Sequence, residues 1–186
     1  MSKHSKQINT LGLDVSTSIT GLSLFVNNEC KINEMIDTRN KNKFPTLYDK
    51  ADLIRDRLVE ISKDYEVGQV YIERSLFVFT SGYSSAQILS KLSRFNGIVS
   101  WISYDVFKVN PTLVSSATAR KSCGIKVKRG QNSKQVCLDY VLDEYQEFVL
   151  EYTRSGNLKP GTFDKSDSYI IGKAGWEDWN KKSLKS

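Results

Sequence analysis

Three strand-like segments follow one another near the N-terminus, and their order restricts the fold more than any other feature of the chain. Residues 10–15 are mostly apolar, while residues 20–26 and 30–38 alternate apolar and polar side chains, as half-buried strands do. The short polar stretches between them, residues 16–18 and 27–29, are typical of tight turns. Tight turns join antiparallel neighbours, so the sequence predicts a three-stranded antiparallel meander.

Helices and strands alternate after a polar loop at residues 39–44. Apolar side chains recur every three or four positions in residues 46–65, which predicts an amphipathic helix with Thr46 as its N-cap. Residues 69–72 predict a short buried strand that ends at Glu73. The other expected elements are a helix at 84–104, a short strand at 107–109, helices at 115–122, 132–145 and 164–173, a basic loop at 124–130 and a Gly/Pro loop at 155–163.

This order of elements predicts an α/β fold whose mixed five-stranded sheet has three antiparallel strands followed by parallel ones and is flanked by helices. The 186 residues suit one domain, residues 1–186, with flexible tails at 1–8 and 176–186. No apolar run approaches the roughly 20 residues that span a bilayer. We therefore expect a cytoplasmic protein with no membrane partner.

Composition removes several kinds of chemistry. The only histidine, His4, lies in the expected N-terminal tail, so serine-type triads and histidine metal sites are not expected. The three cysteines, Cys30, Cys123 and Cys137, are odd in number and widely spaced, which argues against a disulfide framework or a zinc site. The formal net charge of +6 favours a polyanionic partner such as nucleic acid, although many soluble proteins are mildly basic.

Two carboxylates stand at the ends of apolar strands. Asp14 follows residues 11–13 and Glu73 follows residues 70–72, and a lone carboxylate there carries a large desolvation cost unless it meets a cation. In a meander followed by a crossover helix, the first strand is typically central and the strand after the helix lies beside it. We therefore expect Asp14 and Glu73 to be neighbours that a divalent metal keeps ionised. Either acid alone could instead cap a helix or pair with a lysine or arginine.

A second pair of acids lies near the C-terminus. Asp164 and Asp167 are three residues apart and therefore share one face of the expected helix. Capping and the helix dipole account for Asp164, but less well for a second aspartate followed by apolar residues 169–171. Oxygen ligands suit Mg²⁺, and two metal ions about 3.5–4 Å apart can activate a water and stabilise the leaving oxygen of a phosphodiester.

Several of these stretches match one family. Residues 12–21, Gly-Leu-Asp-Val-Ser-Thr-Ser-Ile-Thr-Gly, resemble the first strand and turn of the RuvC-type Holliday junction resolvases, members of the ribonuclease H-like superfamily. Residues 71–77 resemble the strand with their second acid and the aromatic beyond it, and residues 164–168 resemble their D-x-x-D pair. Residues 84–97 and 130–136 are similar to the family's long helix and Lys-Gln-Val stretch.

The resemblance covers residues 8–175, most of the chain. It departs at Val15-Ser16, where the bacterial enzymes usually have Pro-Gly. The connection at residues 145–163 is also longer than usual. Such departures are typical of phage or other viral relatives.

The resemblance implies a structure-selective endodeoxyribonuclease that resolves Holliday junctions and other branched DNA by symmetric nicks. It implies two Mg²⁺ ions per active site, or Mn²⁺ in their place, held by Asp14, Glu73, Asp164 and Asp167. Lys134 would stabilise phosphate charge, and Phe77 would contact the junction near the crossover. It also implies a homodimer in a bacterial or phage-infected cell, for which we expect Leu89, Leu92 and Phe95 to contribute to the interface.

A basic stretch completes the predicted DNA-binding surface. Its cations flank Gly124 and Gly130, as in a phosphate-binding loop. The predicted DNA-binding residues are Arg74, Phe77, Arg120, Lys121, Lys126, Lys128 and Arg129. Lys134 and the basic stretch could instead be a solvated face, and Phe77 a core or interface aromatic.

Other functions fit parts of the pattern. One alternative is a general branched-DNA or flap nuclease of the same fold, and another is a non-catalytic DNA-binding module, against which the presence of all four acids argues. The first motif also resembles the phosphate loops of actin-like ATPases and sugar kinases. Those proteins need a second lobe and a second phosphate loop, and the sequence shows neither.

Overall fold

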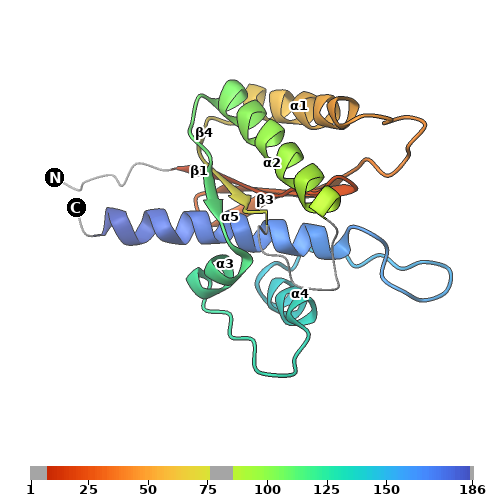
Figure 1. Ribbon diagram of the computed structural model, residues 1–186. Helices are drawn as coiled ribbons and strands as arrows, with labels where there is room; N and C mark the ends of the chain where they lie inside the picture. The colour runs from red at the N-terminus through yellow and green to blue at the C-terminus, as the bar shows by residue number, and fades with distance from the viewer. Residues whose placement is uncertain (1–7, 76–85, 185–186) are drawn as a thin grey trace.

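The computed structural model describes residues 8–75 and 86–184 of the chain. Within them, five strands form one sheet in the order β3-β2-β1-β4-β5 (Figure 1). The strands are β1 (Asn9–Asp14), β2 (Ile19–Val26), β3 (Glu29–Asp37), β4 (Val67–Glu73) and β5 (Thr112–Val114). The first three pair antiparallel, whereas β4 is parallel to both β1 and β5. This arrangement confirms the predicted mixed sheet, with β1 at its centre.

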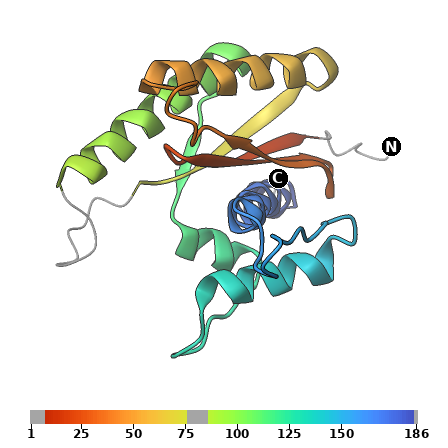
Figure 2. The ribbon, with the colours of Figure 1, turned by 90° about the vertical axis from the view of Figure 1, so that its right-hand side faces the viewer.

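Helices cover both faces of the sheet. Two of them, α1 (Leu47–Asp64) and α2 (Ala86–Phe107), lie on one face. The long α5 (Thr162–Ser183) lies against the other face, and α3 (Ser116–Ser122) and α4 (Ser133–Glu144) pack on its outer side. Figure 2 shows these layers in order, with α1 and α2 above the strands, α5 below them and α3 and α4 lowest.

Alternation along the strands builds two separate cores. Leu11 and Leu13 of β1 join the core under α1 and α2, whereas Gly12 between them faces α5. In β4, Ile72 belongs to the first core and Tyr71 to the second, which α3, α4 and α5 share. Successive side chains of a strand point to opposite faces, so the residue after Leu13 and the residue after Ile72 must face α5.

Polar side chains cap the helix starts that the sequence predicted. The Thr46 hydroxyl accepts a hydrogen bond from the Asp49 amide at the start of α1, and the Asp49 carboxylate accepts one from the Thr46 amide. Ser115 and Asn132 cap α3 and α4 with their side-chain oxygens, without a reciprocal bond. These local signals explain why three helices begin at or next to the residues expected.

The predicted strand at residues 107–109 is wrong. α2 continues to Phe107 and ends before Lys108, which has a positive φ of 57°. Val106 and Phe107 pack against the first core, so helical packing extends further than the sequence pattern indicated. The short strand β5 begins only after Pro111, at Thr112.

The C-terminal helix is longer than predicted. It continues past Lys173 to Ser183, so residues 176–183 are helical where we expected a tail. The reason is tertiary, because Asp178 accepts a hydrogen bond from Ser122 of α3. All three cysteines are free thiols. Among the described residues, no helix is both long and apolar enough to cross a membrane.

Candidate active site

Asp14 and Glu73 end two neighbouring parallel strands. Leu13 of β1 is paired with Ile72 of β4, so the next residue of each strand stands at the same level of the sheet. Both carboxylates face α5, since Leu13 and Ile72 face the other core. A hydrogen bond joins the two acidic side chains. The structure thus brings together the two acids that the strand order predicted to be neighbours.

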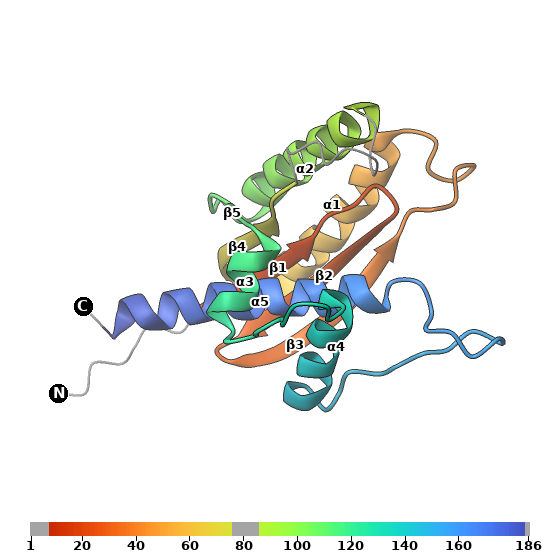
Figure 3. The ribbon, with the colours of Figure 1, turned by 60° about the horizontal axis from the view of Figure 1, so that its bottom comes forward.

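Glycine lets the start of α5 reach these acids. Gly21 is the partner of Asp14 across β1 and β2, and a Cβ atom there would lie 1.9 Å from the Asp164 carbonyl oxygen. A Cβ on Gly12 would lie 2.3 Å from the nitrogen of Gly172, which lies further along α5 than Asp164. Real Cβ contacts are never that short, so α5 can lie along β1 and β2 only because both strands carry glycine there (Figure 3).

Buried hydrogen bonds fix the same turns of α5 against the sheet. The Asn33 amide of β3 donates to the Lys165 carbonyl at 2.9 Å and to the Ser23 hydroxyl at 2.8 Å. Ser23 and Ser168 join their hydroxyls at 2.9 Å, and both are fully buried. Because Lys165 and Ser168 flank Asp167, this network holds the turns that carry the aspartates.

The four acids share one electrostatic environment. Burial raises the pKa of Asp14 well above its usual range, and the charges of Glu73, Asp167 and Asp164 raise it further. Burial, followed by the Glu73 charge, raises the pKa of Asp167 to about 6. The pKa of Asp164 is also raised, chiefly by burial. These shifts come first from burial and, for Asp14 and Asp167, also from nearby carboxylates, as is typical of a buried acid cluster.

Two cations border the acids. The charges of Lys134 and Arg120 counteract the rise in the pKa of Asp167, and Lys134 does the same for Asp164. Arg120 also lines a small recess together with Glu73 and Asp167. The exposed Lys134 begins α4, with its ammonium 5.8 Å from the Phe163 ring centre. The structure therefore places both cations near the acids, and the family resemblance implied such a position for Lys134.

The donor set fits hard cations. Asp14, Glu73, Asp164 and Asp167 offer only oxygen atoms, the ligands that Mg²⁺ prefers. None of the four is fully buried, so water and substrate phosphate could complete the coordination. In the described residues, no three acidic, histidine or cysteine side chains converge into a ready coordination shell, as expected of carboxylates that repel one another.

The other predicted DNA-binding residues lie around this site in different ways. Lys121 of α3 and the loop residues Lys126, Lys128 and Arg129 are exposed, on the side of α5 away from the sheet. Arg74 is exposed directly after Glu73, and its guanidinium donates to the Leu113 carbonyl at 3.3 Å. Phe77 lies outside the described residues.

Sequence reasoning missed three residues that support the site. The Asn96 side chain of α2, only 5% exposed, donates to the Glu73 carbonyl at 2.8 Å. Lys50 of α1 is 8% exposed, and its ammonium donates to the Thr17 and Thr38 carbonyls, joining the turn after β1 to the loop after β3. Arg39 in that loop lies near enough to lower the pKa of Asp164. A polar residue on an apolar helix face was the available signal for Asn96 and Lys50.

Comparisons with known proteins agree with this architecture. No protein-family model and no curated protein sequence matches the chain. Among solved structures, Thermus thermophilus RuvC is similar with a TM-score of 0.64 and 12% identity, over 95% of this chain and 98% of the other.

Two further structures are similar over nearly the whole chain. RuvC of the same bacterium in complex with a Holliday junction substrate has a TM-score of 0.62 and 12% identity, over 94% of this chain and 95% of that one. The yeast mitochondrial Holliday junction resolvase Ydc2 has a TM-score of 0.60 and 14% identity, over 95% of this chain and 80% of that one. The chain therefore has the ribonuclease H-like fold of RuvC.

Proposed function

We propose that the protein is a magnesium-dependent endonuclease that cuts four-way junctions and related branched DNA. The observation that carries the proposal is the meeting of Asp14, Glu73, Asp164 and Asp167 from three elements on the α5 face of the sheet. Burial raises the pKa of the three aspartates, and neighbouring carboxylates raise it further for Asp14 and Asp167, so keeping the acids ionised requires added positive charge. Divalent cations would supply that charge.

Each part of the site has a role in phosphodiester hydrolysis. The four carboxylates would hold two Mg²⁺ or Mn²⁺ ions, which when bound activate a water and stabilise the leaving oxygen. Lys134 and Arg120 lie at the edge of the acids and would neutralise the phosphate of the cut strand. The exposed cations Lys121, Lys126, Lys128 and Arg129 would bind the flanking backbone.

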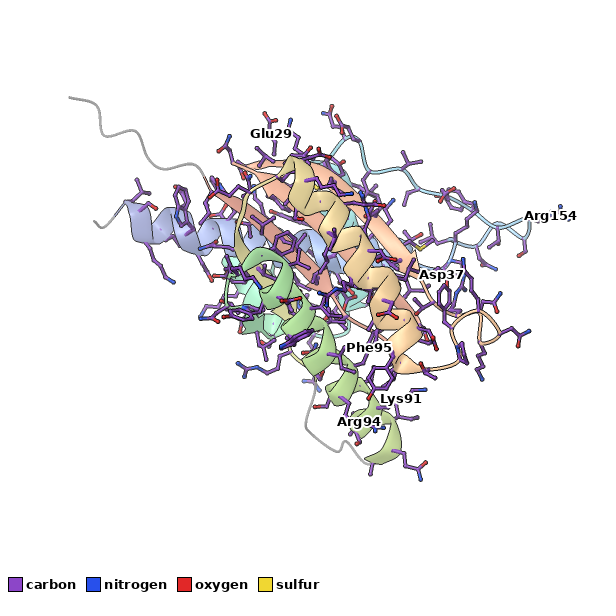
Figure 4. All side chains as sticks on the ribbon, turned by 90° about the horizontal axis from the view of Figure 1, so that it is seen from above. Glu29, Asp37, Lys91, Arg94, Phe95 and Arg154 are labelled. Atoms are coloured by element: carbon purple, nitrogen blue, oxygen red, sulfur yellow. The ribbon has the colours of Figure 1, made fainter. Side chains whose placement is uncertain are left out.

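Symmetric nicks on opposed strands need two active sites related by a two-fold axis, so the proposal includes a homodimer. The expected contribution of Phe95 is wrong, because this side chain is fully buried in the core under α1 and α2 (Figure 4). Leu89 and Leu92 are half-buried. The outer face of α2 instead exposes Trp101 by 59% and Tyr104 by 45%. We therefore assign the dimer contact to this face. We also propose that the protein acts in the cytoplasm.

Cleavage of matched DNA substrates tests the activity. Wild-type protein with Mg²⁺ should cut a four-way junction faster than a linear duplex, a flap or an RNA–DNA hybrid, and a chelator should stop the reaction. Asp14→Asn should abolish cleavage but keep junction binding, since the amide removes one metal ligand without adding bulk. Substantial cleavage by this variant would disprove the metal assignment. Equal cutting of flaps and junctions would favour the general branched-DNA nuclease.

Sedimentation tests the dimer. Trp101→Glu should give folded monomers that nick a junction but rarely release two ligatable duplexes. Tyr152→Glu, in the exposed loop before α5, is a control for added negative charge. A wild-type protein that stays monomeric yet makes paired symmetric cuts would rule out this assembly.

A further inference from the structure

Hydrogen bonds hold the loop between β3 and α1 in a defined conformation. Thr38, 1% exposed, begins it and donates its hydroxyl to the Ser18 carbonyl. The Asn40 side chain accepts hydrogen bonds from the Asn42 and Lys43 amides at 3.0 and 3.1 Å. Phe44 then returns to the interior, only 7% exposed. The residues between Thr38 and Phe44 are thus held out from the molecule in a defined turn.

This loop carries three cations, and a fourth lies on α2. Arg39, Lys41 and Lys43 are exposed. Arg39 is held by Asp37 through two of its nitrogens, at 2.9 and 2.6 Å. Lys91 of α2 is also exposed, and Figure 4 shows it on the N-terminal half of α2, near the start of α1. We call Arg39, Lys41, Lys43 and Lys91 the α1-side basic surface.

The fold brings these like charges together from separate elements. Besides burial, the charges of Lys91 and Lys41 lower the pKa of Lys50, which therefore lies near both, while the charge of Asp37 opposes them. Lys50 itself is not available to bind a ligand, because it is buried and its ammonium donates hydrogen bonds to the Thr17 and Thr38 carbonyls. Its positive charge adds to the repulsion that the two exposed lysines already experience. Such a concentration of positive charge on one surface attracts polyanions.

The α1-side basic surface lies across the acids from the basic residues of α3 and α4. The loop leads into α1 above the sheet, whereas α3 and α4 lie below α5 (Figure 2). Arg39 follows Thr38, whose hydroxyl donates to the Ser18 carbonyl in the turn after Asp14, whereas Lys134 comes from α4 in the opposite layer. The four acids therefore stand between two separate groups of cations. A single straight duplex held by α3 and α4 would leave the α1 side unused.

We propose that the α1-side basic surface binds the phosphate backbone of a second arm of a branched DNA, while α3 and α4 bind the arm that is cut. This inference rests on the proposed function and adds to it a structural source of selectivity. A branched substrate would engage both surfaces, and a linear duplex only one. Preference for branched DNA would then come from two groups of phosphate contacts, without any reading of bases.

Salt-dependent binding measures the contribution of the α1 side. The double variant Lys41→Gln, Lys43→Gln removes two exposed charges but leaves Arg39, which pairs with Asp37. Each lost phosphate contact lowers the log–log salt slope by about 0.9, so the slope for a four-way junction should fall by about 1.8. The slope for a linear duplex should not change. The junction-over-duplex preference should fall by at least about tenfold at moderate salt.

Two control variants share the same readout. Lys63→Gln, Lys182→Gln removes two exposed lysines at the far ends of α1 and α5, and it should leave the junction slope at the wild-type value. Lys41→Arg, Lys43→Arg keeps the charge and should keep both the slope and the preference. Equal thermal unfolding temperatures would show that all three variants are folded.

The outcomes separate the two proposals. If wild-type protein cuts junctions but the Lys41→Gln, Lys43→Gln variant keeps the wild-type junction slope, the second-arm inference is wrong and the proposed function stands. An equal loss for duplex and junction would also overturn it, because the loop would then serve the same arm as α3 and α4. If wild-type protein neither binds nor cuts branched DNA, the proposed function fails and the inference fails with it.

Discussion

The two faces of the central sheet carry different kinds of side chain. The face under α1 and α2 is filled by large aliphatic side chains, including Leu11, Leu13, Ile54 and Leu58, all fully buried. The face under α5 has Gly12 and Gly21 at the closest contacts, and buried hydroxyls and amides between them and the helix. The same strand thus presents a packed core on one side and a close helix contact on the other.

This difference separates stability from positioning. Aliphatic packing tolerates small shifts, since removing a methylene leaves the neighbouring backbone near its place. Backbone contact through glycine does not tolerate them, because any added atom must move the helix itself. The acids lie where the close contact is made, and a displacement near 1 Å at a reacting centre can lower a rate about 100-fold. We therefore expect mutations on the two faces to separate activity from stability.

The largest effect on activity is expected from Gly21→Ala. The new Cβ would overlap the Asp164 carbonyl oxygen and force the start of α5 away from Asp14. Junction cleavage should fall at least about 100-fold, with weaker Mg²⁺ binding by calorimetry and an unchanged far-UV spectrum. Gly97→Ala is the matched control, since no atom lies within 4 Å of a Cβ at Gly97. Normal cleavage by Gly21→Ala would contradict the positioning role of this face.

Leu58→Ala tests the opposite face. Leu58 is fully buried in the core under α1 and α2, far along α1 from its start. Truncation should lower the free energy of unfolding by about 2–5 kcal/mol, measured by urea denaturation. Cleavage by the folded protein at low temperature should stay within about twofold of wild type. A loss as large as that of Gly21→Ala would mean that both faces position the acids.

The acid cluster should make metal-free stability depend on pH in an unusual direction. The folded-state pKa of Asp167 is raised from 3.8 to about 6, so the folded protein binds the proton more tightly than the unfolded chain. Stability should therefore fall as pH rises from about 4 to about 6 and stay lower above it. The contribution of Asp167 is on the order of 2–3 kcal/mol.

Thermal unfolding with and without Mg²⁺ measures this effect. Without metal, Asp167→Asn should be more stable than wild type at pH 7.5 and lose most of the pH dependence in that window. Mg²⁺ should stabilise wild type at pH 7.5 more than at pH 5, because protonated carboxyls bind it weakly. A wild-type protein whose metal-free stability rises steadily over this range would show that the acids are already compensated.

The smallest effect is expected from Asn33→Ala. It removes two hydrogen bonds to the Lys165 carbonyl and the Ser23 hydroxyl, worth about 1 kcal/mol each or less. Cleavage should fall only about threefold to tenfold, because Gly12 and Gly21 still allow the close approach of α5. Asn157→Ala, whose side chain is exposed in the loop before α5, is the control. Loss of all activity would move the positioning role from the glycines to this network.

Local patterns determined the strands, the helix starts and the strand-end acids. Alternation located β1 to β3 and β4, because a half-buried strand repeats every two residues whatever packs on it. Thr46, Ser115 and Asn132 marked helix starts, since capping depends only on neighbouring amides. The parallel neighbours β1 and β4 followed from chain order, and with them the meeting of Asp14 and Glu73.

Only tertiary structure decided which residues surround those acids. Arg39, Lys50 and Asn96 lie far from the acids in sequence, and no local signal shows that three elements bring them to one end of the sheet. The same holds for Phe95, because the helical pattern alone does not show whether this side chain is buried or exposed. It also holds for the extension of α5 to Ser183, which packs against α3. From the sequence alone, Gly12 and Gly21 are residues that weaken a strand. They acquire their role from a helix about 150 residues later in the chain, because only the absence of a Cβ atom lets its backbone reach theirs.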